Sequence, residues 1–258
     1  MDLSVIILTC DNNIDLAPFV KKTCDNFEKE GVGTLIVTET KNPIYSGYQL
    51  FSIPSESFST RFRSAVSNVN TSHVLVLLDD YFVYDNHLAR KIAVWKKEIA
   101  DSNFVALRVC KNKHLFKSIR IDQNQTKHYK TLNFYDIDFH PTIWNRQQLS
   151  NMLDLRNDLS PWQIEPLFKL YIQKWNLNSG ISSQYIKYDE LVIQGKFFRR
   201  AYIKHVKKIY DGNRRQMTIS FSIKRYVKNT IYNLLPRKFI TFLKKFTHKK
   251  YFSDDASL

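Results

Sequence analysis

The sequence predicts an α/β fold with three layers, in which helices cover both faces of a mostly parallel sheet. Apolar runs of strand length alternate with segments of helix length, and the connections between them are short. The run HVLVLL at 73–78 is continuously apolar, which is typical of a strand buried on both faces of a parallel sheet. The chain has 258 residues, enough for one large domain with a sizeable core.

The predicted elements follow from local composition. Short apolar runs rich in β-branched residues predict strands at 3–9, 34–38, 48–53, 73–78 and 104–109. Helices are expected between them, the first ended by Gly31 and the third capped by Asp85, at 14–30, 58–69, 86–99, 146–153 and 166–176. Residues 111–140 are polar and aromatic, with short strands expected around 132–135, and a last strand is expected near 184–188.

Several function classes are excluded by what the sequence lacks. None of its six glycines lies in the turn after the first strand, which argues against Rossmann dehydrogenases and P-loop enzymes. Its three cysteines form no CxxC pair and its seven histidines no HxxxH or HExxH motif, so neither a disulfide framework nor a zinc site is indicated. Because no signal peptide and no membrane-spanning run is evident, we expect a cytoplasmic protein.

The net charge of +15 is concentrated near the C-terminus. Residues 1–195 hold 22 Lys and Arg against 21 Asp and Glu, whereas residues 196–250 hold 17 against one. Such asymmetry indicates an anionic partner, either a membrane surface or a nucleic acid.

The pattern within this basic arm, residues 196–258, favours the membrane. Apolar and aromatic residues recur with basic ones between them over 219–231 and again over 239–246. Amphipathic basic helices of this kind lie in membrane interfaces, and each basic residue near an anionic leaflet contributes about 1 kcal/mol. We therefore expect peripheral attachment to the inner face of the cell membrane. An ordinary helix packed on the core and a nucleic-acid-binding segment are the alternatives.

Acidic residues follow three predicted strands at the point where each strand ends. Asp11 follows the first strand, Glu39 the second, and the pair Asp79 and Asp80 the buried strand at 73–78. Ligands of open parallel sheets bind at the carboxyl ends of the strands. Carboxylates gathered there suit ribose hydroxyls and a divalent ion, and a metal could join them to a diphosphate. The competing explanation is that these residues only form turns and caps.

The residues at these positions resemble a known family. The segments LSVIILTCDN, TLIVTET and VLVLLDDYFVYD, with the helix that carries Arg61 and Arg63, are similar to the nucleotide-sugar domain of GT-A glycosyltransferases. The group they resemble is the family 2-like one that builds bacterial surface polysaccharides such as capsule and O-antigen. The later segments HPTIWNRQQL and SPWQIE resemble the acceptor half of the same enzymes.

The resemblance implies a GT-A fold, Rossmann-like, with a C-terminal helical basic extension. Residues 1–110 would form the nucleotide-sugar-binding half, 111–195 the acceptor-binding half, and 196–258 the basic arm. The implied reaction moves a sugar from a nucleoside diphosphate sugar donor to an acceptor, a polyprenyl-diphosphate-linked glycan at the membrane; no nucleic-acid partner is implied.

The metal motif departs from the family pattern of Asp-any-Asp. This chain has Tyr81 where the second carboxylate is expected. Asp79 and Asp80 with the donor phosphates could hold Mg2+ or Mn2+, or the site could work without a metal. In that second case Arg61 or Arg63 could neutralise the diphosphate, since arginine presents a bidentate fork to phosphate, although both could also lie on an exposed helix face.

Glu165 in SPWQIE is the candidate catalytic base. Inverting transfer needs a carboxylate to take the proton of the acceptor hydroxyl, and the similar family motif places its catalytic acid at this position. A role in complementing the helix dipole is the alternative.

His140, Trp144 and Trp162 are candidate acceptor-binding residues, because a ring offers an apolar face and an imidazole a hydrogen bond. Core packing is the competing explanation for the tryptophans. Two other functions remain open for the whole chain: a nucleotidyltransferase, and a non-catalytic nucleic-acid-binding protein that uses the basic arm.

Overall fold

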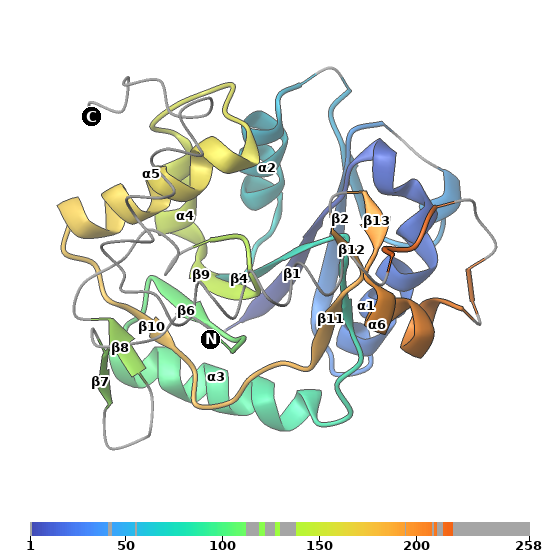
Figure 1. Ribbon diagram of the computed structural model, residues 1–258. Coiled ribbons are helices and arrows are strands. Elements are labelled where there is room, and N and C mark those ends of the chain that lie inside the picture. The colour runs from blue at the N-terminus through green and yellow to red at the C-terminus, as the bar shows by residue number, and fades with distance from the viewer. Residues whose placement is uncertain are drawn as a thin grey trace.

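The computed structural model describes residues 2–40, 43–54, 56–111, 119–121, 127–129, 138–193, 195–207, 209–210 and 214–218. Within them the chain folds into three layers, with helices on both faces of a nine-stranded sheet (Figure 1). The predicted α/β class is therefore confirmed.

The sheet is mixed, with a parallel part that carries the first strands. Its order is β3-β2-β1-β4-β9-β6-β10-β8-β7. The strands β3, β2, β1 and β4 run parallel, β9 is antiparallel to both of its neighbours, and β6 runs parallel to β10. The bounds are β1 (Leu3–Leu8), β2 (Gly33–Thr38), β3 (Leu50–Ser52), β4 (His73–Leu78), β6 (Ala106–Arg108), β7 (Ile119–Ile121), β8 (Lys127–Tyr129), β9 (Thr142–Asn145) and β10 (Ser179–Ile181).

Side chains that alternate along β1 fill two separate cores. Val5 and Ile7 pack toward α1 (Ala17–Glu28) and α3 (Leu88–Ser102), and Ile6 and Leu8 pack toward the other face. That second face is covered by α2 (Phe58–Asn68), α4 (Arg146–Leu153) and α5 (Pro161–Lys174). Full burial of each such side chain stabilises the fold by about 1.5–3 kcal/mol. Two short 3-10 turns, η1 (Asp11–Leu16) and η2 (Pro43–Tyr45), follow β1 and β2.

A third apolar cluster joins the C-terminal part of the described chain to its start. Phe197, Ala201 and Val206 pack with Leu16 and Phe19, the latter on α1. The elements involved are β5 (Tyr81–Val83), paired with β11 (Tyr188–Glu190), then β12 (Val192–Ile193), paired with β13 (Lys196–Phe197), α6 (Arg199–Ala201) and the π-helical turn η3 (Tyr202–Val206). The fold thus continues past residue 195, where we expected the basic arm to begin.

Most predicted elements are present, with corrections. Helix α5 begins at Pro161 rather than at 166, because Ser160 and Gln163 form a capping box and Pro161 occupies the first helical position. In place of the strand expected near 184–188 the chain has β10, which ends before that range, and β11, which begins at its last residue.

Some predictions concern residues that the structure does not describe. The strands expected around 132–135 and the arm helices over 219–246 lie outside the described residues. None of the helices that the structure describes is long and apolar enough to span a membrane.

Candidate functional site

Four acidic side chains follow the carboxyl ends of β1, β2 and β4, which lie at one edge of the sheet. The register pairs Leu8 with Val37 on one side and with Leu78 on the other, so the three strands end level with one another. The loops after these strands carry Asp11, Glu39, Asp79 and Asp80. The edge predicted from the sequence therefore exists.

Asp79 is buried and holds the loop that follows β1. Its Oδ2 accepts a hydrogen bond from the backbone N–H of Cys10 at 3.1 Å, and its Oδ1 accepts one from the side-chain amide of Asn13 at 3.0 Å. Burial raises the pKa of Asp79 to about 6, against these hydrogen bonds, which lower it. Both carboxylate oxygens are thus engaged within the protein.

Asp80 differs from its neighbour because one of its oxygens is buried without a partner. Its Oδ1 has no hydrogen-bond partner among the described residues. Burial, with the nearby carboxylates of Asp79 and Glu190, raises the pKa of Asp80 well above its usual value. Glu190 comes from β11, where it lies opposite Tyr81 in the antiparallel pairing. A buried carboxylate oxygen of this kind is suited to an incoming cation.

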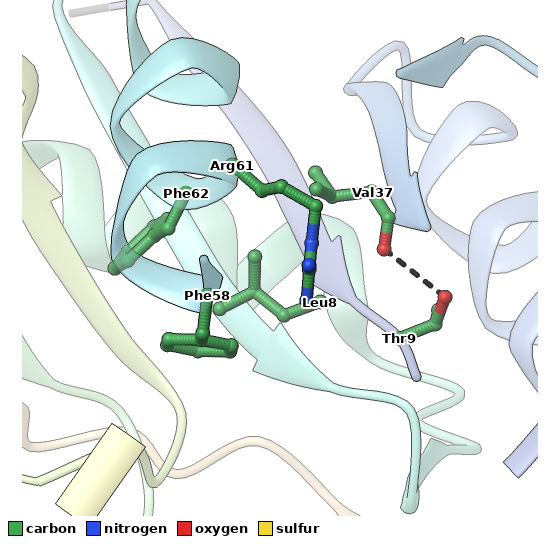
Figure 2. Close-up of a pocket in the computed structure, with 6 residues that line it drawn as sticks. All are labelled: Leu8, Thr9, Val37, Phe58, Arg61 and Phe62. Atoms are coloured by element: carbon green, nitrogen blue, oxygen red, sulfur yellow. Dashed lines mark hydrogen bonds between the residues drawn. The ribbon is translucent and has the colours of Figure 1, made fainter. Parts of the chain in front are cut away.

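Glu39 organises the other side of the edge. It accepts hydrogen bonds from the backbone of Asp11 at 2.9 Å and from the guanidinium of Arg61 at 3.1 Å. Arg61 also donates to the backbone oxygen of Glu56. Figure 2 shows the Arg61 side chain reaching from α2 across a pocket lined by Leu8, Thr9, Val37, Phe58, Arg61 and Phe62. Arg61 therefore faces the strand ends, with Glu39 as its counter-ion.

Arg63 is not part of this edge, contrary to our expectation. Its guanidinium donates to the side-chain oxygen of Asn157 at 2.9 Å and lies 3.6 Å from the carboxylate of Asp154. Residues two apart on a helix point about 200° apart around its axis, so Arg61 and Arg63 cannot both face the strand ends.

Arg214 reaches the edge from far along the chain and was not predicted. It donates to both carboxylate oxygens of Asp15, at 2.7 and 2.5 Å, to the backbone oxygen of Asn12 at 2.8 Å and to the side-chain oxygen of Asn13 at 3.0 Å. Although burial acts in the opposite direction, the hydrogen bonds from Arg214 and Tyr210 lower the pKa of Asp15. In the sequence Arg214 is one of many basic residues, and no local signal distinguishes it.

Glu165 lies in the first turns of α5, as its sequence motif predicted. Its Oε1 accepts a hydrogen bond from the backbone N–H of Phe139 at 3.0 Å. Burial raises the pKa of Glu165 to about 7, against the hydrogen bond from Phe139, which lowers it; Asp138, His140 and Arg108 are its ionisable neighbours. A carboxylate with a pKa near neutrality is suited to exchange a proton during catalysis.

A buried ion pair fixes the residues beside Glu165. The carboxylate of Asp138 lies 3.1 Å from the guanidinium of Arg108 and 2.9 Å from Nδ1 of His140. The ring of His140 stacks on Tyr81, with 5.9 Å between centroids and 24° between planes. Because Tyr81 directly follows Asp80, this stack connects the neighbourhood of Glu165 with the acidic edge.

The two tryptophans have different positions. Trp144 is only 2% exposed and packs on Phe168 with 4.8 Å between ring centroids, so it belongs to the core and is not available to an acceptor. The cause is its place on β9, in the middle of the sheet. Trp162, in the first turn of α5, is 74% exposed and free to contact a ligand.

A metal site made by the protein alone is not present in the part of the chain that the structure describes: no three His, Cys, Asp or Glu side chains there are grouped to hold an ion. The residues that fit a divalent cation are Asp80, through its unpartnered oxygen, and Asp79 beside it. Such an ion would need further ligands from a bound molecule.

Comparisons with known proteins place the chain by fold. No family model matches it, and no curated protein matches it. Among solved structures, residues 1–349 of S. aureus TarS in complex with UDP-GlcNAc align with 12% identity and a TM-score of 0.50, over 76% of this chain and 60% of that one. HddC from Yersinia pseudotuberculosis aligns with 14% identity and a TM-score of 0.50, over 81% of this chain and 99% of that one.

A putative glucose-1-phosphate thymidylyltransferase from Bacillus anthracis also aligns, with 12% identity and a TM-score of 0.48, over 82% of this chain and 98% of that one. At these identities the likeness concerns the fold alone. The chain has the Rossmann-like α/β fold that it shares with TarS and HddC, and it matches only about 60% of the length of the TarS chain.

Proposed function

We propose that this chain is a transferase that uses a nucleotide sugar, and more specifically a glycosyltransferase. The observation that carries the proposal is the convergence of two carboxylate centres from distant parts of the sequence. Asp79 and Asp80 lie at the strand ends, and Glu165 lies beside His140, whose ring stacks on Tyr81. The complex of TarS with UDP-GlcNAc supports a donor of this class for the shared fold.

In this proposal the donor binds at the acidic edge, where Asp11, Glu39 and Arg61 are available to the nucleoside. Mg2+ or Mn2+ held by Asp80, with Asp79 beside it, would neutralise charge on the leaving diphosphate. The unpartnered oxygen of Asp80 supports a cation there, because an uncompensated buried carboxylate is costly.

The acceptor would lie between Glu165 and the donor. Glu165 takes the proton of the acceptor hydroxyl as that oxygen forms its bond to the anomeric carbon. The bond from the anomeric carbon to the diphosphate breaks on the opposite face, and the configuration inverts. Asp138 fixes Nδ1 of His140, which leaves the Nε2 edge of the half-exposed ring for the acceptor. Trp162 offers an exposed aromatic face on the first turn of the same helix.

We propose a polyprenyl-diphosphate-linked glycan as the acceptor and the anionic inner face of the cell membrane as its location, in the synthesis of a bacterial surface polysaccharide. The basic residues of 196–250 support this location at the membrane. Eight of its 17 Lys and Arg lie in 196–218, which includes the part packed on the fold, and nine lie in 219–250.

A nucleotidyltransferase is the second candidate, since the same fold and the same acidic edge would serve a nucleotide in that reaction too. The loop 9–13, which contains no glycine, favours glycosyl transfer, because a glycine-rich loop is expected there in a nucleotidyltransferase. In the glycosyltransferase proposal Glu165 has the role of the base.

The test is titration calorimetry of the full chain with UDP, GDP, CDP and dTDP, with and without Mn2+, followed by transfer assays with the matching nucleotide sugars. The assays use lipid-linked acceptors in one arm, and nucleoside triphosphates with sugar 1-phosphates in the other. Sugar transfer to a lipid-linked acceptor supports the proposal. Release of pyrophosphate from a triphosphate would establish the second candidate, and binding of none of the nucleotides would overturn both.

A further inference from the structure

The C-terminal part of the described chain, residues 196–207, 209–210 and 214–218, returns to the loop that follows β1. Phe197 donates its backbone N–H to Arg215 and accepts one from Met217, both at 3.0 Å. Figure 1 shows this segment, in orange, beside α1 and the other elements of the third core cluster. The pairing fixes the backbone that directly follows Arg214.

Arg214 is held in one orientation by several partners at once. Its guanidinium forms a fork on the carboxylate of Asp15, and its backbone N–H donates to the hydroxyl of Tyr210, which itself donates to Asp15. Bidentate pairs of this kind are directional as well as strong. The position of the guanidinium is therefore set by the fold.

The contact that matters for the acidic edge is the one with Asn13. Arg214 donates to Oδ1 of Asn13 at 3.0 Å, and the amide nitrogen of Asn13 donates to Oδ1 of Asp79 at 3.0 Å. The side-chain amide of Asn13 has an oxygen that accepts hydrogen bonds and a nitrogen that donates them. Arg214 holds the oxygen, so the nitrogen points toward the carboxylate of Asp79. Arg214 at the oxygen and the carboxylate of Asp79 at the nitrogen therefore favour the same orientation of this amide.

We propose that Arg214 is a positioning residue of the donor site, acting through Asn13 on the carboxylate of Asp79. The donor site is then complete only when Tyr210 and Arg214 contact the loop after β1. This inference rests on the proposed function, because it concerns the site assigned to the donor.

The test compares Arg214→Ala with Arg215→Ala, which removes the same charge from the exposed neighbouring residue. Nucleoside diphosphate affinity is measured for UDP, GDP, CDP and dTDP, and the KM values for donor and acceptor are measured separately. We expect Arg214→Ala to weaken nucleotide binding and to raise the donor KM by about 10- to 100-fold. Losses of this size are usual when a residue that orients a binding residue is removed. The acceptor KM of Arg214→Ala should equal that of the parent, and Arg215→Ala should bind nucleotide as tightly as the parent does.

Three further variants separate positioning from general stabilisation. Arg214→Lys keeps the charge without the fork and recovers part of the affinity. Asn13→Asp keeps an acceptor for Arg214 but places a carboxylate opposite Asp79, so it loses as much affinity as Arg214→Ala. The double variant of Arg214→Ala with Asn13→Ala loses no more than either single variant. The inference would be overturned if the affinity losses of the two single variants added up in the double variant, or if Arg215→Ala lost as much affinity as Arg214→Ala.

Amide hydrogen exchange over residues 9–16, measured without nucleotide, tests whether Arg214 positions this loop. The result does not depend on whether the protein binds a nucleotide sugar. Exchange rises in Arg214→Ala and not in Arg215→Ala if Arg214 positions the loop. If the parent protein binds none of the four nucleotides, the proposed function fails, and the exchange result alone decides the positioning role. Unchanged exchange in Arg214→Ala overturns it.

Discussion

The backbone amide of Phe139 donates a hydrogen bond to the carboxylate of Glu165, with 3.0 Å between N and Oε1. The next residue, His140, stacks on Tyr81, which follows the acidic pair at the end of β4. Two contacts thus link the candidate base on α5 with the candidate donor site. Direct displacement at a sugar carbon requires that the base and the donor reach the same acceptor hydroxyl, and these two contacts bring their neighbourhoods together.

Glu165→Gln should reduce kcat by about 10²- to 10⁴-fold, the usual contribution of a general base, and should leave the nucleotide affinity unchanged. The glutamine oxygen can still accept the hydrogen bond from Phe139, so the fold around α5 is retained. Steady-state kinetics with calorimetry for the nucleotide check both parts. Glu30→Gln, at an exposed carboxylate, is the control. Full turnover in Glu165→Gln would remove this residue from the mechanism.

The same substitution should change how stability depends on pH. Burial raises the pKa of Glu165 from 4.5 to about 7, and Asp138, His140 and Arg108 are the ionisable groups that face it. Between these values the folded state holds the proton that the unfolded chain has released, so this group makes the protein less stable as pH rises through that window. Glu165→Gln cannot titrate, and its stability relative to the parent should rise from pH 4.5 to 7 and level off above.

Urea unfolding of both proteins at pH 5, 6, 7 and 8 measures this difference, again with Glu30→Gln as the control. A stability difference that is the same at all four pH values would contradict the raised pKa of Glu165.

Asp79→Asn and Asp80→Asn should have different effects. Asp79 accepts two N–H donors from the loop after β1, and an asparagine can accept only through one oxygen. We expect the Asp79→Asn variant to lose about 1–3 kcal/mol of stability and to bind nucleotide more weakly with or without Mn2+. Asp80→Asn should be at least as stable as the parent at neutral pH, because burial raises the pKa of Asp80 and the substitution removes that group. It should lose only the part of the nucleotide affinity that Mn2+ adds.

Calorimetry with and without Mn2+, together with thermal unfolding, separates the two variants. If Mn2+ strengthens nucleotide binding equally in the parent and in Asp80→Asn, the ion is not held by Asp80.

The sequence was sufficient for features that depend on neighbouring residues. The run at 73–78 identified the central strand β4, and acidic residues directly after strands identified the edge, because parallel strands end together. That Arg61 and Arg63 would not both face the site could also have been predicted, since residues two apart on a helix lie on opposite faces. Trp144 was harder, because an antiparallel strand in the middle of a sheet has no distinct pattern of its own.

Features that depend on distant pairing could not be predicted. β5 is three residues long and exists because β11, more than a hundred residues later, pairs with it. Arg214 meets Asp15 across 199 residues, and the local sequence around it is simply basic. In both cases the determinant is the packing of the third core cluster, which no single segment encodes.

Trp144→Ala and Trp162→Ala form a matched pair with opposite expectations. Trp144 packs on Phe168 in the core, and its removal should cost about 3–5 kcal/mol of stability. Trp162 is exposed, so its removal should leave stability within about 0.5 kcal/mol and raise the acceptor KM alone. Denaturant unfolding and acceptor kinetics check the pair. An unchanged acceptor KM in Trp162→Ala would exclude it from the acceptor site.

Deleting residues 219–258 should detach the protein from anionic membranes without disturbing the donor site. The deletion removes nine of the 17 basic residues of 196–250 and keeps the described segment that ends at Thr218. At about 1 kcal/mol for each basic residue near an anionic leaflet, loss of even half of them should reduce the affinity by several orders of magnitude. A shorter protein ending at residue 214 would be a poor comparison, because it also loses the pairing of Phe197 with Arg215 and Met217.

Sedimentation with vesicles of phosphatidylglycerol and phosphatidylcholine measures binding, and nucleotide calorimetry on the same sample shows that the donor site is intact. Raising the salt concentration should release the full chain in the same way, because charge attraction over a Debye length is screened. If the truncated protein sediments as fully as the parent, the docking surface lies within the folded part, where the basic residues of 196–218 are the next candidates.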